Sequence, residues 1–226
     1  MMLRLEFHLA LRQTEGQMAS KFALLDVPLR TPDDRTLSRR ARRMESISKG
    51  RLLPDGPIQS LIDSTGLKLF GTGECLQEKH GAKARRAWEE LHLAVDADSG
   101  MIMASTLTGN DVGDPSQMVP LPDRIEATIA SVAADGTYDG MPTYEVVAHH
   151  GEDVRVIIPH HLTAVLRVEA KHNPSKRDPH ILSIAARGRL GWQEDTDYGQ
   201  RALVETAIGR YEAIIGPCLR ARSPSG

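Results

Sequence analysis

The spacing of apolar residues changes near residue 58. Before that point apolar side chains recur every three or four positions, which predicts short amphipathic helices across residues 3–45. The first helical stretch is expected to end near Gly16, and the last is expected to begin after Thr31, which would serve as its N-cap. A Gly- and Pro-rich linker follows at 48–57, and beyond it short alternating or apolar stretches are typical of strands.

This second part of the chain predicts a sheet with helices between its later strands. A Ser-Gly turn joins the second and third strands, so these two form a hairpin. Helices separate the strands that follow, which favours parallel crossovers and a mixed α/β sheet flanked by helices on both faces. This is the layout of the ribonuclease-H-like fold. The expected elements are strands at 58–63, 87–96, 101–109, 128–135 and 154–159, helices at 112–127, 142–151 and 199–216, and a mobile polar insertion at 167–180.

We therefore expect a small helical segment at 1–47, the linker at 48–57, an α/β domain at 58–222 and a tail at 223–226.

Composition sets further limits on the class of protein. Hydrophobic residues make up 40% and charged residues 26% of the 226 positions, which is ordinary for a soluble protein. No apolar run approaches the length that spans a bilayer, so no membrane is expected as a partner. The two cysteines are far apart, which argues against zinc or a disulfide framework and fits a reducing cytoplasm.

Basic residues gather locally although the net charge is only −2. Residues 35–51 hold seven basic side chains against one acid, and Arg35, Arg39 and Arg42 would share one face of a helix. Such a cluster can neutralise DNA phosphates, and two short helices before a basic helix resemble a helix-turn-helix arrangement. A helical hairpin with a solvated charged face explains the same pattern.

Three acids are candidates for chemistry. Asp63 ends the first predicted strand and Asp135 ends the fourth, so in parallel neighbours both would lie at one edge of the sheet. Glu205 lies on the long helix expected beside that edge. Three converging carboxylates repel one another unless a cation lies between them, and Mg²⁺ or Mn²⁺ prefers such oxygen ligands. The alternative is that these residues are ordinary strand ends that meet solvent next to Gly-rich turns.

Several segments together resemble the DDE transposases of bacterial insertion sequences, and the likeness runs from about residue 3 to 222. The family's Tyr-x2-Arg-x3-Glu-x6-Lys signature is matched by Tyr198, Arg201 and Glu205, with Glu212 in the lysine position. The other segments that carry the likeness are LIDSTGLKLFGTGE, EKHGAKARRAWEELHLAVDADSG, VAADGTYDG, VIIP and GQRALVETAIGRYEAIIG.

The resemblance implies that the domain at 58–222 is catalytic, with Asp63, Asp135 and Glu205 as catalytic residues and metal ligands. It also implies that Tyr198 and Arg201 contact DNA, with Arg201 reaching phosphate at the cleavage site. Double-stranded DNA, as element ends and as target, would be the partner of a homo-oligomer in the bacterial cytoplasm, associated with the nucleoid. Lys68 and Lys79 follow Asp63 closely in sequence and are further candidates for phosphate contact.

Departures from the family pattern leave alternatives open. Glu212 would repel a phosphate that lysine attracts, Cys75 replaces the usual tryptophan, and Glu89 and Glu90 occupy usually basic positions. The chain also begins inside the family's helical region and stops where relatives continue into another helix, so a copy shortened at both ends is expected. The alternatives to an active transposase are a non-catalytic DNA-binding remnant and a simple metal-dependent nuclease of the same fold.

Overall fold

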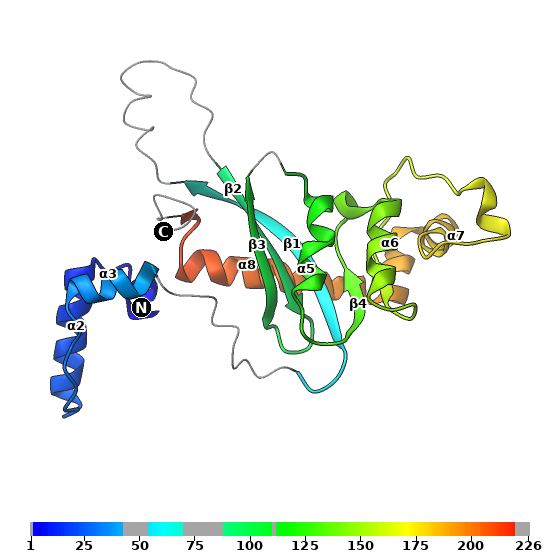
Figure 1. Cartoon of the computed structure of the whole chain (residues 1–226). Helices are drawn as coiled ribbons and strands as arrows, with labels where there is room; N and C mark the ends of the chain where they lie inside the picture. The colour runs from blue at the N-terminus through cyan, green and yellow to red at the C-terminus, as the bar shows by residue number, and fades with distance from the viewer. Residues whose placement is uncertain (1, 43–53, 70–87, 110–111, 220–226) are drawn as a thin grey trace, which may run out of the picture. The chain divides into compact units, whose positions relative to one another are not determined.

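The structure is a computed structural model that describes residues 2–42, 54–69, 88–109 and 112–219. The chain separates into two compact units. One comprises Met1–Leu52, Leu69–Arg85 and Tyr211–Gly226, and the other comprises Leu53–Lys68 and Arg86–Arg210. The second unit contains the sheet and the candidate chemistry (Figure 1).

The first unit contains the N-terminal helices, and two of their predicted ends are wrong. The second helix continues through Gly16, because a single glycine costs only about 1 kcal/mol inside a helix. The third helix begins later than Thr31, and Asp33 caps it: its Oδ1 accepts a hydrogen bond of 2.7 Å from the N–H of Thr36. This unit's described elements are α1 (Met2–Glu6), α2 (Leu11–Leu24), α3 (Asp34–Arg42) and β6 (Cys218–Leu219).

The second unit is built on a mixed sheet with the strand order β3-β2-β1-β4-β5. The pairs β1–β2 and β2–β3 are antiparallel, whereas β1–β4 and β4–β5 are parallel. An initial meander followed by helical crossovers makes the fold ribonuclease-H-like, as predicted. The strands are β1 (Ile58–Leu69), β2 (Trp88–Asp96), β3 (Ile102–Gly109), β4 (Ile129–Ala133) and β5 (Arg155–Ile157).

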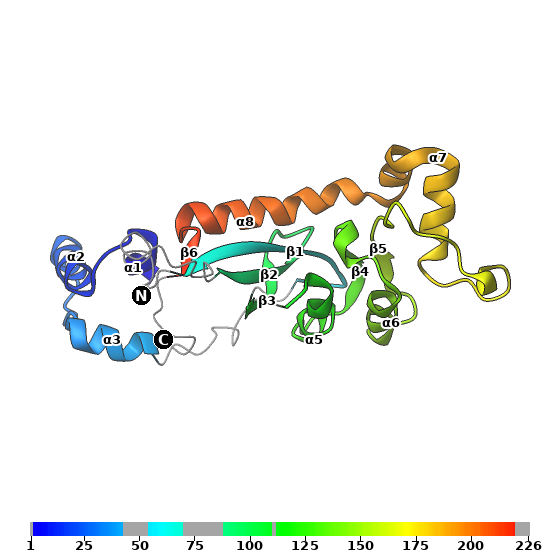
Figure 2. The same ribbon diagram turned by 90° about the horizontal axis from the view of Figure 1, so that it is seen from above.

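Helices cover both faces of this sheet (Figure 2). On one face, even-numbered residues of β1 and β2 such as Ile62 and Ala94 pack with Met118, Leu121 and Val147 from the helical segments of the β3–β5 region. The other face packs against the two C-terminal helices. The helical elements are η1 (Asp114–Met118), α5 (Pro120–Asp123), η2 (Gly136–Tyr138), α6 (Met141–His149), η3 (Val168–Lys171), α7 (Asp178–Thr196), η4 (Tyr198–Arg201) and α8 (Ala202–Ile214).

The predicted strand ends and helix faces are partly wrong in this unit. β1 continues to Leu69, because its pairing with β2 extends to Lys68, so Asp63 lies within a strand rather than at its end. The polar insertion leads into α7, a helix that the sequence pattern did not predict and that is kinked at Gly188, where φ is +74°.

The sequence pattern also predicts an inward face for the long helix, and this prediction is only partly right. Its members are Leu203, Ala207, Ile208, Tyr211, Ile214 and Ile215. Ala207 and Ile208 are buried as expected, but Val204 is buried in place of Leu203, which is 41% exposed. Ile214 is 50% exposed. Residues 204, 207 and 208 share a helix face at three- and four-residue spacing, and position 203 lies about 100° away from Val204 around the axis. In the described residues no helix combines the length and the apolar character needed to cross a membrane.

Candidate active site

Asp63 and Asp135 lie at the same place in the sheet because their strands are parallel and adjacent. Leu61 of β1 is in register with Ala133 of β4, and each aspartate comes two residues later. β4 ends at Ala133, so Asp135 leaves the sheet beside Asp63. The parallel pairing that was predicted is thus confirmed, although Asp63 is not a strand end.

The loop after β4 holds Asp135 in a fixed direction. Asp135 is the N-cap of η2, and its Oδ1 accepts hydrogen bonds from the backbone N–H of Thr137, at 2.9 Å, and from the Thr137 hydroxyl. Gly136 lets this turn pack closely, since a Cβ there would lie 3.3 Å from the carbonyl oxygen of Pro159. The second carboxylate oxygen, Oδ2, therefore remains directed toward the neighbouring groups of the site.

Arg201 connects all three predicted acids. Its Nη2 donates a hydrogen bond of 2.9 Å to Oδ2 of Asp63 and lies 3.9 Å from Oδ2 of Asp135. Its Nη1 donates to Oε1 of Glu205, one helical turn further along, at 2.7 Å. Asp63, Asp135 and Glu205 come from three elements that are remote in the chain, and the fold brings them to one guanidinium.

Burial perturbs the charges in this group. It raises the pKa of Asp63 above its ordinary value, although Arg201 and the N–H of Ser64 act in the opposite direction. Burial also acts to lower the pKa of Arg201, but the Asp63 carboxylate and its other neighbours raise it beyond its usual range. When all three acids are ionised, one guanidinium leaves about two negative charges unbalanced.

This donor set fits a divalent cation. All three side chains offer carboxylate oxygens, the ligands that Mg²⁺ and Mn²⁺ prefer. The excess charge equals that of one such ion, and the side chain of Glu205 is 57% exposed, so one side of the group is open to solvent and substrate.

Tyr198 and the C-terminal end of α7 pack together and stabilise the turn that carries Arg201. The Tyr198 ring lies 5.1 Å, centroid to centroid, from the ring of Trp192, whose side chain is fully buried. Tyr198 opens η4, the single turn that carries Arg201. Burial raises the pKa of Tyr198, so its hydroxyl remains protonated at neutral pH. Tyr198 thus packs beneath the site.

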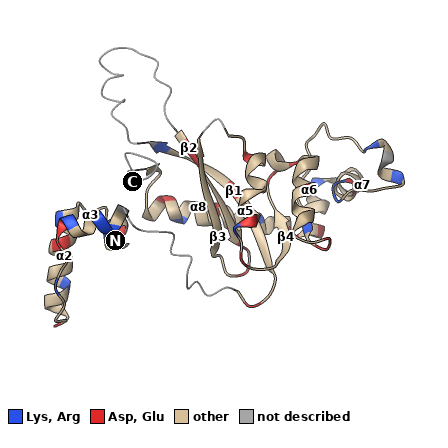
Figure 3. Ribbon diagram, in the orientation of Figure 1, with Lys and Arg blue, Asp and Glu red and all other residues tan. Residues whose placement is uncertain are grey.

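The remaining predicted DNA contacts belong to β1, to α3 of the other unit, or to residues outside the described ranges. Lys68 is exposed at the far end of β1, where its ammonium lies over the Trp88 ring, 5.4 Å from the centroid. Arg35 and Arg39 are exposed on α3 in the other unit, and Figure 3 shows basic residues along that helix. Arg42 ends α3, and Lys79 lies outside the described residues, as does Cys75.

A second polar group, which the sequence pattern did not predict, lies on the opposite face of the sheet. Glu90 and His92 of β2 and Asp114 of η1 place one ligand-type atom each within 4.8 Å of one another. Burial lowers the pKa of His92 and raises that of Glu90, and in Glu90 the Asp114 charge adds to the effect. The only signal in the sequence was the alternation of Glu90 and His92 on one strand face, and it gave no indication that Asp114 would join them.

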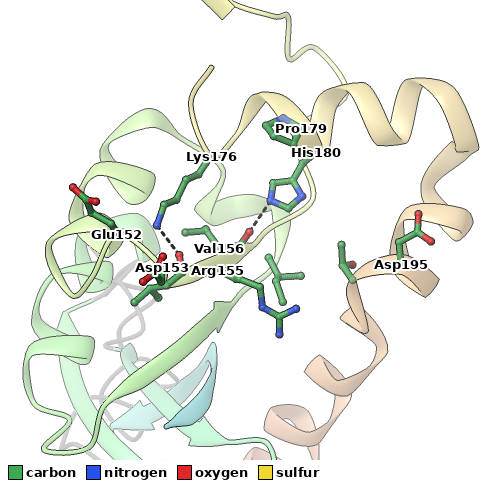
Figure 4. Close-up of a pocket in the computed structure, with 11 residues that line it drawn as sticks. Glu152, Asp153, Arg155, Val156, Lys176, Pro179, His180 and Asp195 are labelled. Atoms are coloured by element: carbon green, nitrogen blue, oxygen red, sulfur yellow. Dashed lines mark hydrogen bonds between the residues drawn. The ribbon is translucent and has the colours of Figure 1, made fainter. Parts of the chain in front are cut away.

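A cavity of about 450 Å³ lies between β5 and α7 (Figure 4). Two of the three basic side chains that line it, Lys176 and His180, form hydrogen bonds that hold the fold together. Lys176 donates a hydrogen bond of 2.7 Å to the carbonyl oxygen of Val154. His180 donates from Nε2 to the carbonyl oxygen of Val156 at 2.6 Å and accepts from Trp192 Nε1 at 2.9 Å. None of the three candidate acids lines this cavity, so the carboxylate group remains a separate candidate site.

Comparison with known protein families agrees with the geometry. One family model, described as a transposase DDE domain, matches residues 54–223. A second model with the same description matches residues 1–72. The first match alone covers well over half of the chain and contains all three carboxylates with Arg201. The chain therefore belongs to the DDE transposase domain family.

Proposed function

We propose that this protein is a DNA transposase that cuts DNA strands at the ends of a mobile element and joins them to target DNA. The observation that carries the proposal is the convergence of Asp63, Asp135 and Glu205 on the guanidinium of Arg201. Membership of a transposase family makes DNA the expected substrate.

In this proposal Asp63, Asp135 and Glu205 hold Mg²⁺ or Mn²⁺. Divalent ions bound there would activate the attacking water or 3′ hydroxyl and stabilise the leaving 3′ oxygen. The protein's part is to hold the carboxylates in place: Asp63 on a paired strand, Asp135 on a hydrogen-bonded turn and Glu205 on a packed helix. A rigid arrangement of this kind lowers the cost of reorganisation during reaction.

Arg201 has two tasks in the proposal. Without a bound cation its guanidinium partly balances the three carboxylates. With DNA bound, the same planar group can turn toward a phosphate, for which its paired N–H donors are well suited. Tyr198, packed against Trp192, fixes the turn from which Arg201 projects. The exposed arginines of α3, Arg35 and Arg39, are proposed to contact the DNA backbone outside the catalytic unit.

The test uses duplex DNA from both sides of the gene, where a mobile element carries its terminal inverted repeats. Purified protein should nick this duplex in the presence of Mg²⁺ or Mn²⁺ and then join the freed 3′ end to a second duplex. Asp135→Asn should abolish nicking, because it removes a carboxylate from the group. The matched control is Asp98→Asn, which changes an exposed aspartate in the β2–β3 turn.

The outcomes separate the possible functions. Nicking with strand joining supports a transposase, whereas nicking without joining indicates a simple nuclease of the same fold. Folded protein that binds the repeats but does not nick them with either metal is a non-catalytic remnant. Nicking that survives Asp135→Asn at the control rate would show that the carboxylate group is not the active site.

A further inference from the structure

A separate cluster of ligand-type side chains lies on the face of the sheet opposite the proposed active site. Asp63 and Ser64 are consecutive in β1, so their side chains project to opposite faces. Ser64 pairs with His92 across the β1–β2 ladder, and Glu90 lies two residues from His92 on the same face. Asp114 comes from η1, which packs on this face.

His92 is the most informative member of this cluster. Its side chain is fully buried, and its Nδ1 has no hydrogen-bond partner among the described residues. The nearest acidic atom, Oδ1 of Asp114, is 3.7 Å away, too far for a hydrogen bond. A buried polar atom left without a partner costs about 1–3 kcal/mol, so such an atom calls for an explanation.

The other ring nitrogen of His92 is already engaged. Nε2 lies 2.9 Å from the hydroxyl of Thr108 on the neighbouring strand. When Nε2–H donates to that hydroxyl, Nδ1 keeps a lone pair and lies 3.7 Å from Oδ1 of Asp114. A hydrogen bond on the distal nitrogen is the arrangement that orients metal-binding histidines.

The surroundings supply further partners. Ser64 donates a hydrogen bond of 3.1 Å from its hydroxyl to Oδ1 of Asp114, which fixes that carboxylate. The hydroxyl of Tyr138 is also buried and has no hydrogen-bond partner within the part of the chain that the structure describes. Burial, followed by the Asp114 charge, raises the pKa of Tyr138. Two partnerless buried polar groups therefore lie in the field of the same carboxylate.

We propose that Glu90, His92 and Asp114 bind a divalent transition-metal ion, with Zn²⁺ as the best fit, at a structural site separate from the active site. One imidazole nitrogen and two carboxylate oxygens suit Zn²⁺ better than Mg²⁺, which prefers oxygen ligands alone. Atoms bound to one zinc ion lie about 3–4 Å apart, so a small closing movement of ligands now within 4.8 Å of one another would complete the site. The ion would fasten η1 to β2.

The experiment measures metal binding by the full-length protein after treatment with a chelator. Co²⁺ is titrated first, because its visible absorption reports nitrogen and oxygen coordination, and Zn²⁺ then competes for the same site. Both titrations use an Asp63→Asn, Asp135→Asn background, in which the carboxylate group of the active site is disabled. Binding in this background is therefore independent of whether the transposase proposal holds.

We expect one Zn²⁺ per chain in this background, with displacement of Co²⁺ and a rise in melting temperature. His92→Gln should weaken binding by about 100-fold or more and remove the rise in melting temperature. His149→Gln is the matched control, since it changes an exposed histidine of α6 and should leave both readouts unchanged. Asp114→Asn, at a side chain that is 25% exposed, serves as a second test if the His92 variant does not fold.

Two results would overturn the proposal. One is Zn²⁺ binding of equal affinity with and without His92→Gln or Asp114→Asn. The other is the absence of stoichiometric Co²⁺ and Zn²⁺ binding by folded background protein, in which case a buried water or a direct histidine–aspartate contact satisfies Nδ1.

Discussion

Replacing Arg201 by glutamine should destabilise the protein and make it respond more strongly to divalent metal ions. The substitution removes the guanidinium that, among the described residues, contacts all three carboxylates of the proposed active site. Since Asp63 is largely buried, with a side chain only 15% exposed, it would lose the main charge that compensates it.

The magnitude follows from the separate contacts. The hydrogen bond to Asp63 is charge-assisted and mostly buried, and contacts of this kind contribute about 1.5–3 kcal/mol. The contact with Glu205 is an exposed i,i+4 pair and contributes only about 0.3–0.5 kcal/mol. Asp135, at 3.9 Å, is not hydrogen-bonded to the guanidinium and adds little. We therefore expect Arg201→Gln to lower the free energy of unfolding by about 2–3 kcal/mol.

The assay is urea unfolding followed by the fluorescence of Trp192, which is buried beside Tyr198, in a Trp88→Phe background. For an m-value of about 2 kcal/mol/M, the midpoint should fall by about 1 M. Arg210→Gln is the matched control, because it changes an exposed arginine of α8 and should move the midpoint very little.

Metal ions should reduce the difference in the midpoint of urea unfolding between Arg201→Gln and the unchanged protein. A cation bound to the freed carboxylates at ten times its dissociation constant stabilises the folded state by about 1.4 kcal/mol. In the unchanged protein the same cation competes with Arg201, so its effect should be smaller. The reasoning is refuted if Arg201→Gln unfolds at the same urea concentration as Arg210→Gln, or if Mn²⁺ shifts both variants equally.

Two further predictions concern the fold around the site. Gly188→Ala should destabilise the protein by about 1–2 kcal/mol, because the kink in α7 requires positive φ. Gly209 lies inside α8 with open space around it, so Gly209→Ala should stabilise the protein by about 0.5–1 kcal/mol. Equal melting temperatures of the two variants would contradict this. Burial acts to raise the pKa of Asp139, but the bidentate contact from Arg177 and the His161 N–H lower it below its ordinary value. The contribution of Asp139 to stability is therefore present above the unfolded pKa of about 3.9 and is lost as pH falls through the lower folded value. The loss of stability caused by Asp139→Asn, measured by urea unfolding, should therefore shrink on acidification. A loss that stays constant from pH 6 to about pH 3 would contradict this.

The parallel pairing of the first and fourth strands could be predicted from the sequence, because periodicity and helix crossovers imply it. Backbone pairing alone brings Asp63 and Asp135 together when a strand at 128–135 lies parallel to 58–63. The pairing of Leu61 with Ala133 confirms that placement. The segments whose apolar residues alternate clearly became β2 and β3.

What the sequence did not predict depends on contacts between remote residues. The length of β1 is set by its partner β2 rather than by its own composition, which includes Gly66 and Lys68. The central position of Arg201 required the fold that places η4 beside β1. The group of Glu90, His92 and Asp114 likewise forms only after the β2–β3 hairpin and η1 have packed, so no local spacing in the sequence predicts it.

The most direct test of the proposed active site is the anomalous scattering of Mn²⁺ in crystals of the protein. We expect a peak within about 2.5 Å of carboxylate oxygens of both Asp63 and Asp135, with Arg201 turned away from Asp63. A crystal soaked with Mn²⁺ that shows no peak at these carboxylates, and in which Arg201 still contacts Asp63, would contradict it.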